Sequence, residues 1–159
     1  MEKVNRELLM REISSKLHYG VKAKVFGWDE EKGEVEVALR VYSVDTDGYV
    51  YFVPNDFDVD YLSVENCILY LRPMSSMTEE EKSELWFLLS EGRTNIELNS
   101  NGQLTTRDDI KLGFNYPFLC PEASGQYVDW LNEHHFDYRG LIEKGLALEA
   151  PEGMYKKGE

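Results

Sequence analysis

The sequence predicts an α+β fold: an antiparallel β-meander preceded by an N-terminal helix, with further helices packed at one face or one end of the sheet. Three observations predict it. Apolar residues recur at helical spacing over residues 4–17, they alternate with polar residues over residues 21–25 and 35–41, and helical spacing returns after residue 77. The repeat of the pattern therefore changes from that of a helix to that of a strand and back.

The composition is that of a folded protein. The chain has 159 residues, of which 42% are apolar and 13% aromatic, enough to bury a core of its own. We expect a single domain over residues 1–159, with the alternative of two lobes, 1–73 and 74–159, because the pattern changes near Pro73. The two cysteines, Cys67 and Cys120, lack the close spacing of zinc or redox motifs.

The first half contains the clearest elements. Residues 4–17 form an amphipathic helix whose charged residues, Glu12 among them, lie between the apolar positions. An irregular acidic segment at 54–66 leads to a strand at 67–71, which ends before Pro73 because proline cannot donate to a ladder. Ahead of that segment, alternation and turn residues predict a three-stranded antiparallel meander at residues 21–25, 35–41 and 49–53.

The second half is predicted to be mostly helical. Thr78 and Glu81 have the spacing of a capping box for a helix that ends near residue 91, with Gly92 as its C-terminal cap. A second helix over residues 122–135 carries on one side Tyr127, Val128, Leu131 and His135. Between the helices, the sequence indicates a short strand at 95–99, an Asn101-Gly102 turn and an extended piece at 113–121.

The charge of the chain limits its partners. The formal net charge is −13, and 17 basic residues are scattered among 30 acidic ones. Phosphate backbones are bound by clustered Lys and Arg, so we expect no direct nucleic-acid binding. No stretch approaches the roughly 20 apolar residues of a membrane-spanning helix, and the N-terminus is too charged for a secretion signal. We expect a cytoplasmic protein without a membrane contact.

The stretch HHFDYR, residues 134–139, gathers side chains that can perform catalysis. In the enzyme interpretation, His134 or His135 is a general base, Asp137 orients it and Arg139 binds an anion. In the structural interpretation, which we favour, Asp137 caps a short helix at 138–144 that Gly145 closes, and the histidines lie in the last turn of the preceding helix. No nucleophile signature accompanies the cluster.

Metal and cofactor sites are not predicted. Asp129 and Glu133 lie one turn apart on a helix, where His134 or His135 could join them, but the spacing of a His-Glu-x-x-His motif is absent. The sequence also lacks a phosphate-binding glycine loop after a predicted strand and a Gly-x-Ser-x-Gly nucleophile elbow. We therefore expect no metal and no cofactor.

Aromatic residues in and after the meander are candidates for an interaction surface. They are Tyr42, Tyr49, Tyr51, Phe57 and Tyr61. Some of them fall on the face of the sheet opposite the apolar one, so either the C-terminal half covers that face, which we favour, or the face is an exposed patch for a partner. A tyrosine-bearing face rimmed by Asp56, Asp58 and Asp60 would suit a basic or mixed protein partner.

Two phrases of the sequence resemble known proteins. LRPMSSMTEEEK, at 71–82, and DWLNEHHFDYRGLIEKGLALEAPEGMY, at 129–155, are similar to those of uncharacterised proteins in gut Bacteroidales genomes and in the phages and mobile elements they carry. The resemblance implies an intracellular, mobile-element-associated origin. It implies no activity, ligand or partner.

These observations favour a non-enzymatic protein-interaction module with an acidic, tyrosine-bearing surface. The first alternative is a small enzyme that uses His134, His135, Asp137 and Arg139. A third hypothesis is an acidic mimic of nucleic acid aimed at a DNA-binding protein, which requires carboxylates arrayed along one extended face.

Overall fold

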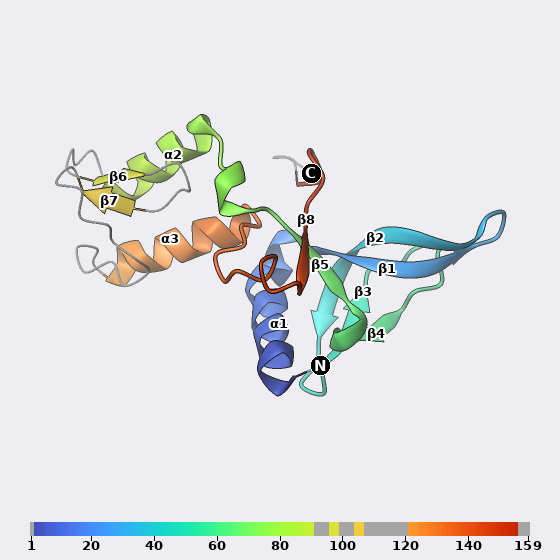
Figure 1. The fold of residues 1–159 in the computed structure, drawn as a ribbon. Coiled ribbons are helices and arrows are strands. Elements are labelled where there is room, and N and C mark those ends of the chain that lie inside the picture. Colours follow the sequence, from blue (N-terminus) through green and yellow to red (C-terminus); the bar gives the residue numbers. More distant parts are fainter. Residues whose placement is uncertain (1, 91–95, 99–103, 107–120, 156–159) are drawn as a thin grey trace. The chain divides into compact units, whose positions relative to one another are not determined.

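The computed structural model describes residues 2–90, 96–98, 104–106 and 121–155 (Figure 1). The chain forms two compact units: Met1–Leu71 together with Arg139–Glu159, and Arg72–Tyr138. The first unit holds α1 (Lys3–Lys16) and a six-stranded sheet, so the predicted α+β fold is confirmed. The boundary between the units lies close to Pro73, but the C-terminal segment returns to the first unit.

The sheet of the first unit has the strand order β4-β3-β2-β1-β5-β8. Neighbouring strands from β4 to β5 are antiparallel, and only β5 and β8 are parallel. The predicted three-stranded meander is confirmed as β1, β2 and β3, of which β1 and β2 form a long hairpin (Figure 1). The strands are β1 (Lys22–Asp29), β2 (Gly33–Val44), β3 (Tyr49–Phe52), β4 (Tyr61–Ser63), β5 (Ile68–Leu71) and β8 (Ala147–Glu149).

Two strands of this six-stranded sheet, β4 and β8, were not predicted. β4 lies within the segment 54–66, which was expected to be irregular, and it pairs with β3 through only three residues. β8 pairs in parallel with β5, the strand predicted at 67–71. The two strands are far apart in the sequence, so no local pattern could predict their pairing. Both strands are short, and their pairing partners rather than their own sequences define them.

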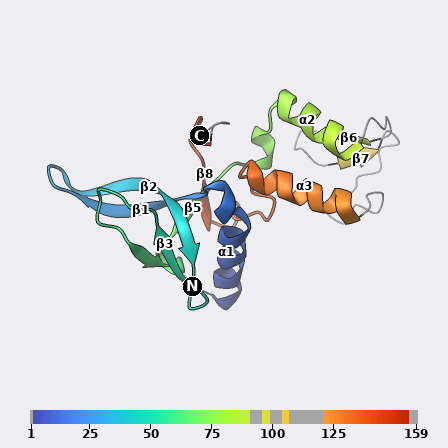
Figure 2. The same cartoon turned by 180° about the vertical axis from the view of Figure 1, so that it is seen from behind.

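The core of the first unit lies between α1 and the inner face of the sheet (Figure 2). Leu9 and Ile13 of α1 are buried against residues that alternate along the strands, as the strand period of two requires. The buried strand residues include Ala23, Val25, Leu39, Val41, Val50, Phe52, Leu69 and Leu71.

A close approach of two chain segments explains one glycine of β1. Gly27 lies against the segment 53–60, whose Phe57 carbonyl accepts a hydrogen bond from the Trp28 N–H at 3.0 Å. A Cβ at Gly27 would lie 2.6 Å from Phe57 Cβ and 3.0 Å from Phe57 O. The Asn55 side chain holds this segment, because its Nδ2 donates to the carbonyls of Val53 and Val59 at 3.0 and 2.8 Å. The segment therefore has little freedom to move away.

Replacing Gly27 with alanine is expected to lower the free energy of unfolding by about 1–3 kcal/mol, the usual cost of overpacking a well-packed site. The matched control is Gly125→Ala, because a Cβ at Gly125 meets nothing within 4 Å and the residue lies inside a helix. That substitution should raise stability by about 0.5–1 kcal/mol. Denaturant unfolding of both variants measures the difference, and equal effects would contradict the close approach.

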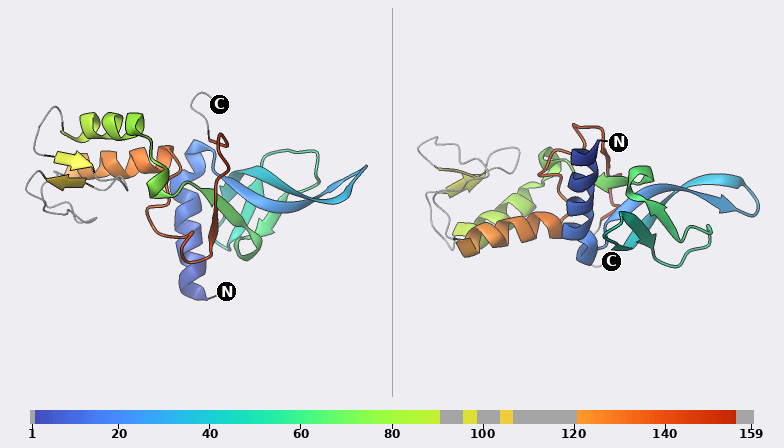
Figure 3. Two further views of the ribbon diagram at one scale, coloured as in Figure 1. Left: turned by 45° about the horizontal axis from the view of Figure 1, so that its top comes forward. Right: turned by 90° about the horizontal axis from the view of Figure 1, so that it is seen from below.

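The second unit contains two helices, α2 (Glu79–Ser90) and α3 (Pro121–Glu133), and an antiparallel pair, β6 (Ile96–Leu98) and β7 (Leu104–Thr106). The helices run side by side (Figure 3). Their core consists of Met77, Leu85, Tyr127, Trp130, Leu131 and Phe136. The predicted strand at 95–99 is confirmed as β6, whereas the expected Gly92 cap, the Asn101-Gly102 turn and most of the piece at 113–121 lie outside the described residues.

The N-terminus of α2 has the predicted capping box. The Glu81 N–H donates to Thr78 Oγ1 and the Thr78 N–H donates to Glu81 Oε1, both at 3.1 Å. Arg72 binds the same carboxylate with both of its terminal nitrogens at 2.7 Å. Burial raises the pKa of Glu81, but the hydrogen bonds from Arg72 and Thr78 outweigh it and leave the pKa below its usual value. The cap is therefore charged at neutral pH.

The end of α3 differs from the prediction. The helix stops at Glu133, and His135 adopts a left-handed conformation with φ 62°. The His135 N–H donates to Asn132 O at 3.1 Å and the Phe136 N–H donates to Leu131 O at 2.9 Å. This pair of bonds is a Schellman motif, with a histidine at the position that glycine usually occupies.

The predicted short helix at 138–144 is wrong. Turns occupy this segment, and Gly140 and Gly145 have positive φ angles of 73° and 74°. A left-handed residue at Gly140 interrupts a right-handed helix two residues after its expected start. Asp137 therefore has no helix to cap, and its N–H donates to Arg72 O at 2.8 Å.

Candidate functional site

Three exposed tyrosines on β3 and β4 form the clearest candidate site, called here the tyrosine surface: Tyr49, Tyr51 and Tyr61. Tyr49 and Tyr51 are two positions apart on β3 and therefore share one face, while Val50 between them is buried. Tyr61 lies directly opposite Tyr51 in the β3–β4 register. Its ring centroid is 5.7 Å from that of Tyr49 and 5.8 Å from that of Tyr51. The three rings thus form one packed aromatic group.

Asp45 fixes one side of the tyrosine surface. Its Oδ1 accepts hydrogen bonds from the N–H groups of Asp47 and Tyr49 at 3.0 and 2.9 Å. Its Oδ2 accepts a hydrogen bond from the Tyr51 hydroxyl at 3.1 Å. The hydrogen bond from the Tyr49 N–H lowers the pKa of Asp45, and the bond to Asp45 raises the pKa of Tyr51. At neutral pH the surface therefore has an ionised carboxylate beside a protonated phenol.

The other two candidate aromatic residues lie apart from this group. Tyr42 of β2 is 68% exposed, and among the described residues no ring contact joins it to the tyrosine surface. Phe57 is partly buried and packs against the core, where it meets Gly27. Of the acidic residues predicted to rim the surface, Asp60 precedes Tyr61 directly and is exposed.

The residues of the HHFDYR stretch are used in packing. The ring of His134 stacks on that of Trp130 with a centroid distance of 3.9 Å, and its Nδ1 lies 2.9 Å from Trp130 O. His135 and Asp137 are buried in the second unit. Arg139 belongs to the first unit, where it donates to Glu12 and to Ser15 Oγ. The enzyme interpretation of these four residues stays a prediction.

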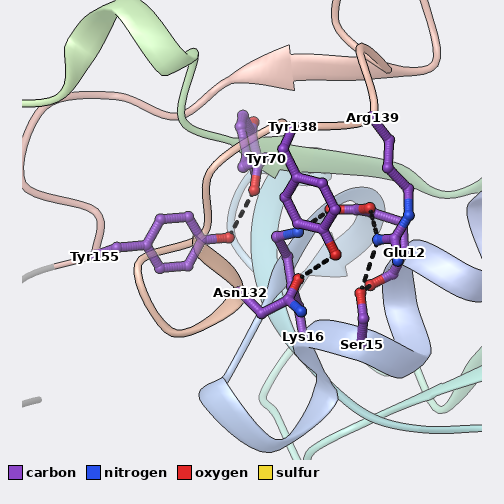
Figure 4. Close-up of polar contacts among 8 residues, drawn as sticks. All are labelled: Glu12, Ser15, Lys16, Tyr70, Asn132, Tyr138, Arg139 and Tyr155. Atoms are coloured by element: carbon purple, nitrogen blue, oxygen red, sulfur yellow. Dashed lines mark hydrogen bonds and ion pairs between the residues drawn. The ribbon is translucent and has the colours of Figure 1, made fainter. Parts of the chain in front are cut away.

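Arg139 is part of a buried ionic cluster that sequence reasoning missed (Figure 4). The Glu12 carboxylate binds Lys16 through one oxygen and Arg139 through the other. The side chains of Glu12 and Lys16 are fully buried, whereas that of Arg139 is 25% exposed. Glu12 and Lys16 are one helical turn apart, a spacing that surface ion pairs share, so the sequence carried no sign of their burial.

Two further polar side chains of the first unit are Tyr155, which is half-buried, and Cys67, which is buried. The Tyr155 hydroxyl donates a hydrogen bond to Tyr70 O at 2.8 Å (Figure 4). It also accepts a hydrogen bond from the Lys22 N–H at 2.8 Å. The C-terminal segment is thereby bonded to β1 and β5. Cys67 is buried, and burial raises the pKa of its thiol to about 12, so it is not a nucleophile at neutral pH.

Within the described residues, no group of three or more His, Cys, Asp and Glu side chains could hold a metal ion. The helices of the same part of the chain are all too short or too polar to cross a membrane.

Comparison of the chain with protein-family profiles, curated proteins and solved structures gave no significant match. The resemblance to proteins of gut Bacteroidales stays a prediction from the two sequence phrases.

Proposed function

We propose that this protein is a non-enzymatic interaction module whose tyrosine surface binds a Lys- or Arg-bearing segment of another protein. The observation that carries the proposal is the packing of three exposed tyrosine rings against one another across β3 and β4. Tyrosine offers large apolar area with few rotatable bonds, which lowers the entropy cost of binding and explains its enrichment in interfaces.

The charge around the tyrosine surface favours a basic partner. Asp45 binds the Tyr51 hydroxyl, Asp47 lies two residues before Tyr49, and Asp60 directly precedes Tyr61. The whole chain has a formal charge of −13. Carboxylates beside the faces of aromatic rings suit a lysine or arginine side chain, which pairs with the acid and stacks on the ring. The same charge disfavours nucleic acid, and we infer a cytoplasmic protein partner.

The proposal is tested by selecting binders from a library of short random peptides displayed on phage, with the full-length protein as bait. Selected peptides should be enriched in Lys and Arg, and their binding should weaken as salt rises. A variant with Tyr49, Tyr51 and Tyr61 all changed to serine should bind them roughly tenfold more weakly or worse, because buried interface tyrosines are frequent hot spots.

The matched control is Phe87→Ser, which removes an aromatic side chain of 69% exposure from the second unit. This variant should bind the selected peptides as the native protein does. Circular dichroism of both variants verifies that the fold is intact. Selected peptides without basic residues, or equal binding by the triple variant, would contradict the proposal.

A further inference from the structure

Two basic side chains face each other at one end of the β1–β2 hairpin. Lys22 and Arg40 are directly opposite in the register of these antiparallel strands. Like charges at such positions repel, and proteins usually place an acid opposite or beside them. Lys24, the next residue on this face of β1, follows that rule, because its Nζ lies 3.4 Å from Glu36.

Lys22 and Arg40 do not follow it. In the part of the chain that the structure describes, neither residue has a carboxylate within 4 Å of its charged nitrogens. This is unexpected in a chain with 30 acidic and 17 basic residues, where an acid is the commonest charged neighbour. An uncompensated pair of cations has a simple explanation if an anion from outside the chain binds there.

The backbone around Arg40 leaves room for its guanidinium. Gly20 ends the turn after α1 with φ 77°, and a Cβ at this position would lie 3.3 Å from Arg40 Nε and 3.4 Å from its Cζ. Because Gly20 has no side chain, Arg40 lies over the turn and reaches a hollow of about 600 Å³ between the end of α1 and β2. Such a volume lies within the usual range for small-molecule sites.

The lining of this hollow combines donors with an apolar floor. Arg40, His18 and the Ser14 hydroxyl can donate hydrogen bonds, and the exposed ring of Tyr42 forms part of the wall. The remaining lining residues are Leu17, Val41 and Val53. A guanidinium binds carboxylate or phosphate through two parallel hydrogen bonds, while the ring and the aliphatic residues contact an apolar group.

We propose that this hollow binds a small molecule that carries a carboxylate or a phosphate on an apolar or aromatic body. Arg40 binds the anionic group, and Lys22 adds a second positive charge beside it. Tyr42 and the aliphatic floor contact the body of the ligand. The site belongs to the first unit alone and is independent of the tyrosine surface.

The test is a titration of the isotope-labelled full-length protein, followed by amide NMR shifts, with benzoate, phenyl phosphate and uncharged benzamide. We expect saturable shifts at the residues lining the hollow with an anionic probe and none with benzamide. Tighter binding of benzoate would identify a carboxylate ligand, and tighter binding of phenyl phosphate a phosphate ligand. Equal responses to all three probes, or shifts only elsewhere, would overturn the proposal.

Substitutions separate this site from general attraction of anions. Arg40→Gln should weaken binding by about tenfold or more, because it removes the charge-assisted hydrogen bonds. The control Lys32→Gln removes an equal charge from the turn at the other end of the same hairpin and should leave the affinity unchanged. Arg40→Gln should also leave the fold intact, since it relieves the repulsion with Lys22. Equal weakening by both variants would overturn the proposal.

Discussion

Replacing Glu12 with alanine is expected to lower the free energy of unfolding by about 3–5 kcal/mol. The substitution removes the carboxylate that binds both Lys16 and Arg139. Arg139 is partly exposed and can turn to water, but Lys16 is fully buried and would lose the carboxylate that pairs with its charge in the core. The lost stability therefore comes mainly from the buried lysine that has lost its ion pair with Glu12, and chemical denaturation measures the loss.

Two further variants identify that cause. Glu7→Ala removes an exposed carboxylate from the same helix and should change stability by less than about 0.5 kcal/mol. Combining Glu12→Leu with Lys16→Met removes both buried charges and fills their volume, which should restore most of the lost stability. If the combined variant is as unstable as Glu12→Ala, then the loss of stability arises from packing, and the buried charge of Lys16 is not its cause.

Replacing Phe136 with alanine is expected to cost about 3–5 kcal/mol in the second unit, the range for large aromatic side chains in a core. Phe136 is fully buried, its ring stacks with Trp130 at 5.8 Å, and the Arg72 guanidinium lies 4.2 Å from its centroid. The Phe136 N–H that completes the motif at the end of α3 remains in the alanine variant, so the expected loss comes from the side chain. Faster amide hydrogen exchange in α3 is the direct measurement.

The matched control for this prediction is Phe87→Ala, which removes the same side chain from an exposed position in α2. It should leave exchange in α3 unchanged and stability within about 0.5 kcal/mol of the native value. Equal acceleration of exchange by both variants would contradict the prediction, because the buried Phe136 side chain would then stabilise α3 no more than the exposed Phe87 side chain does.

Much of the fold could be predicted because periodicity is a local property. The helix at 4–17 and the meander strands repeat their apolar residues within a few positions, and α1, β1, β2 and β3 occupy those places. The capping box of α2 is encoded in four consecutive residues, and its two hydrogen bonds are present. In each case the interaction that defines the element lies within the element or in the next strand.

The candidate sites were also only partly predictable, because some of their features are local and others depend on strand pairing. Tyr49, Tyr51 and Tyr61 could be selected from the sequence because aromatic residues cluster in and after the meander. Only the β3–β4 register placed Tyr61 against both of the others. The opposition of Lys22 and Arg40 likewise depends on the register of the hairpin, because the two residues are far apart in the chain. Phe57 has the same composition signal as the tyrosines and yet packs against the core.

By itself, then, the sequence determined the elements whose cause is local: the helix and strand periods, the capping box and the turn between β2 and β3. Tertiary structure alone decided that β8 returns to pair with β5, that β4 is a strand, and that Glu12 and Lys16 are buried with Arg139. The physical reason is that burial and strand pairing are set by residues from distant parts of the chain. A local pattern indicates which side chains share one face of a helix or strand. It does not indicate which distant residues those side chains contact.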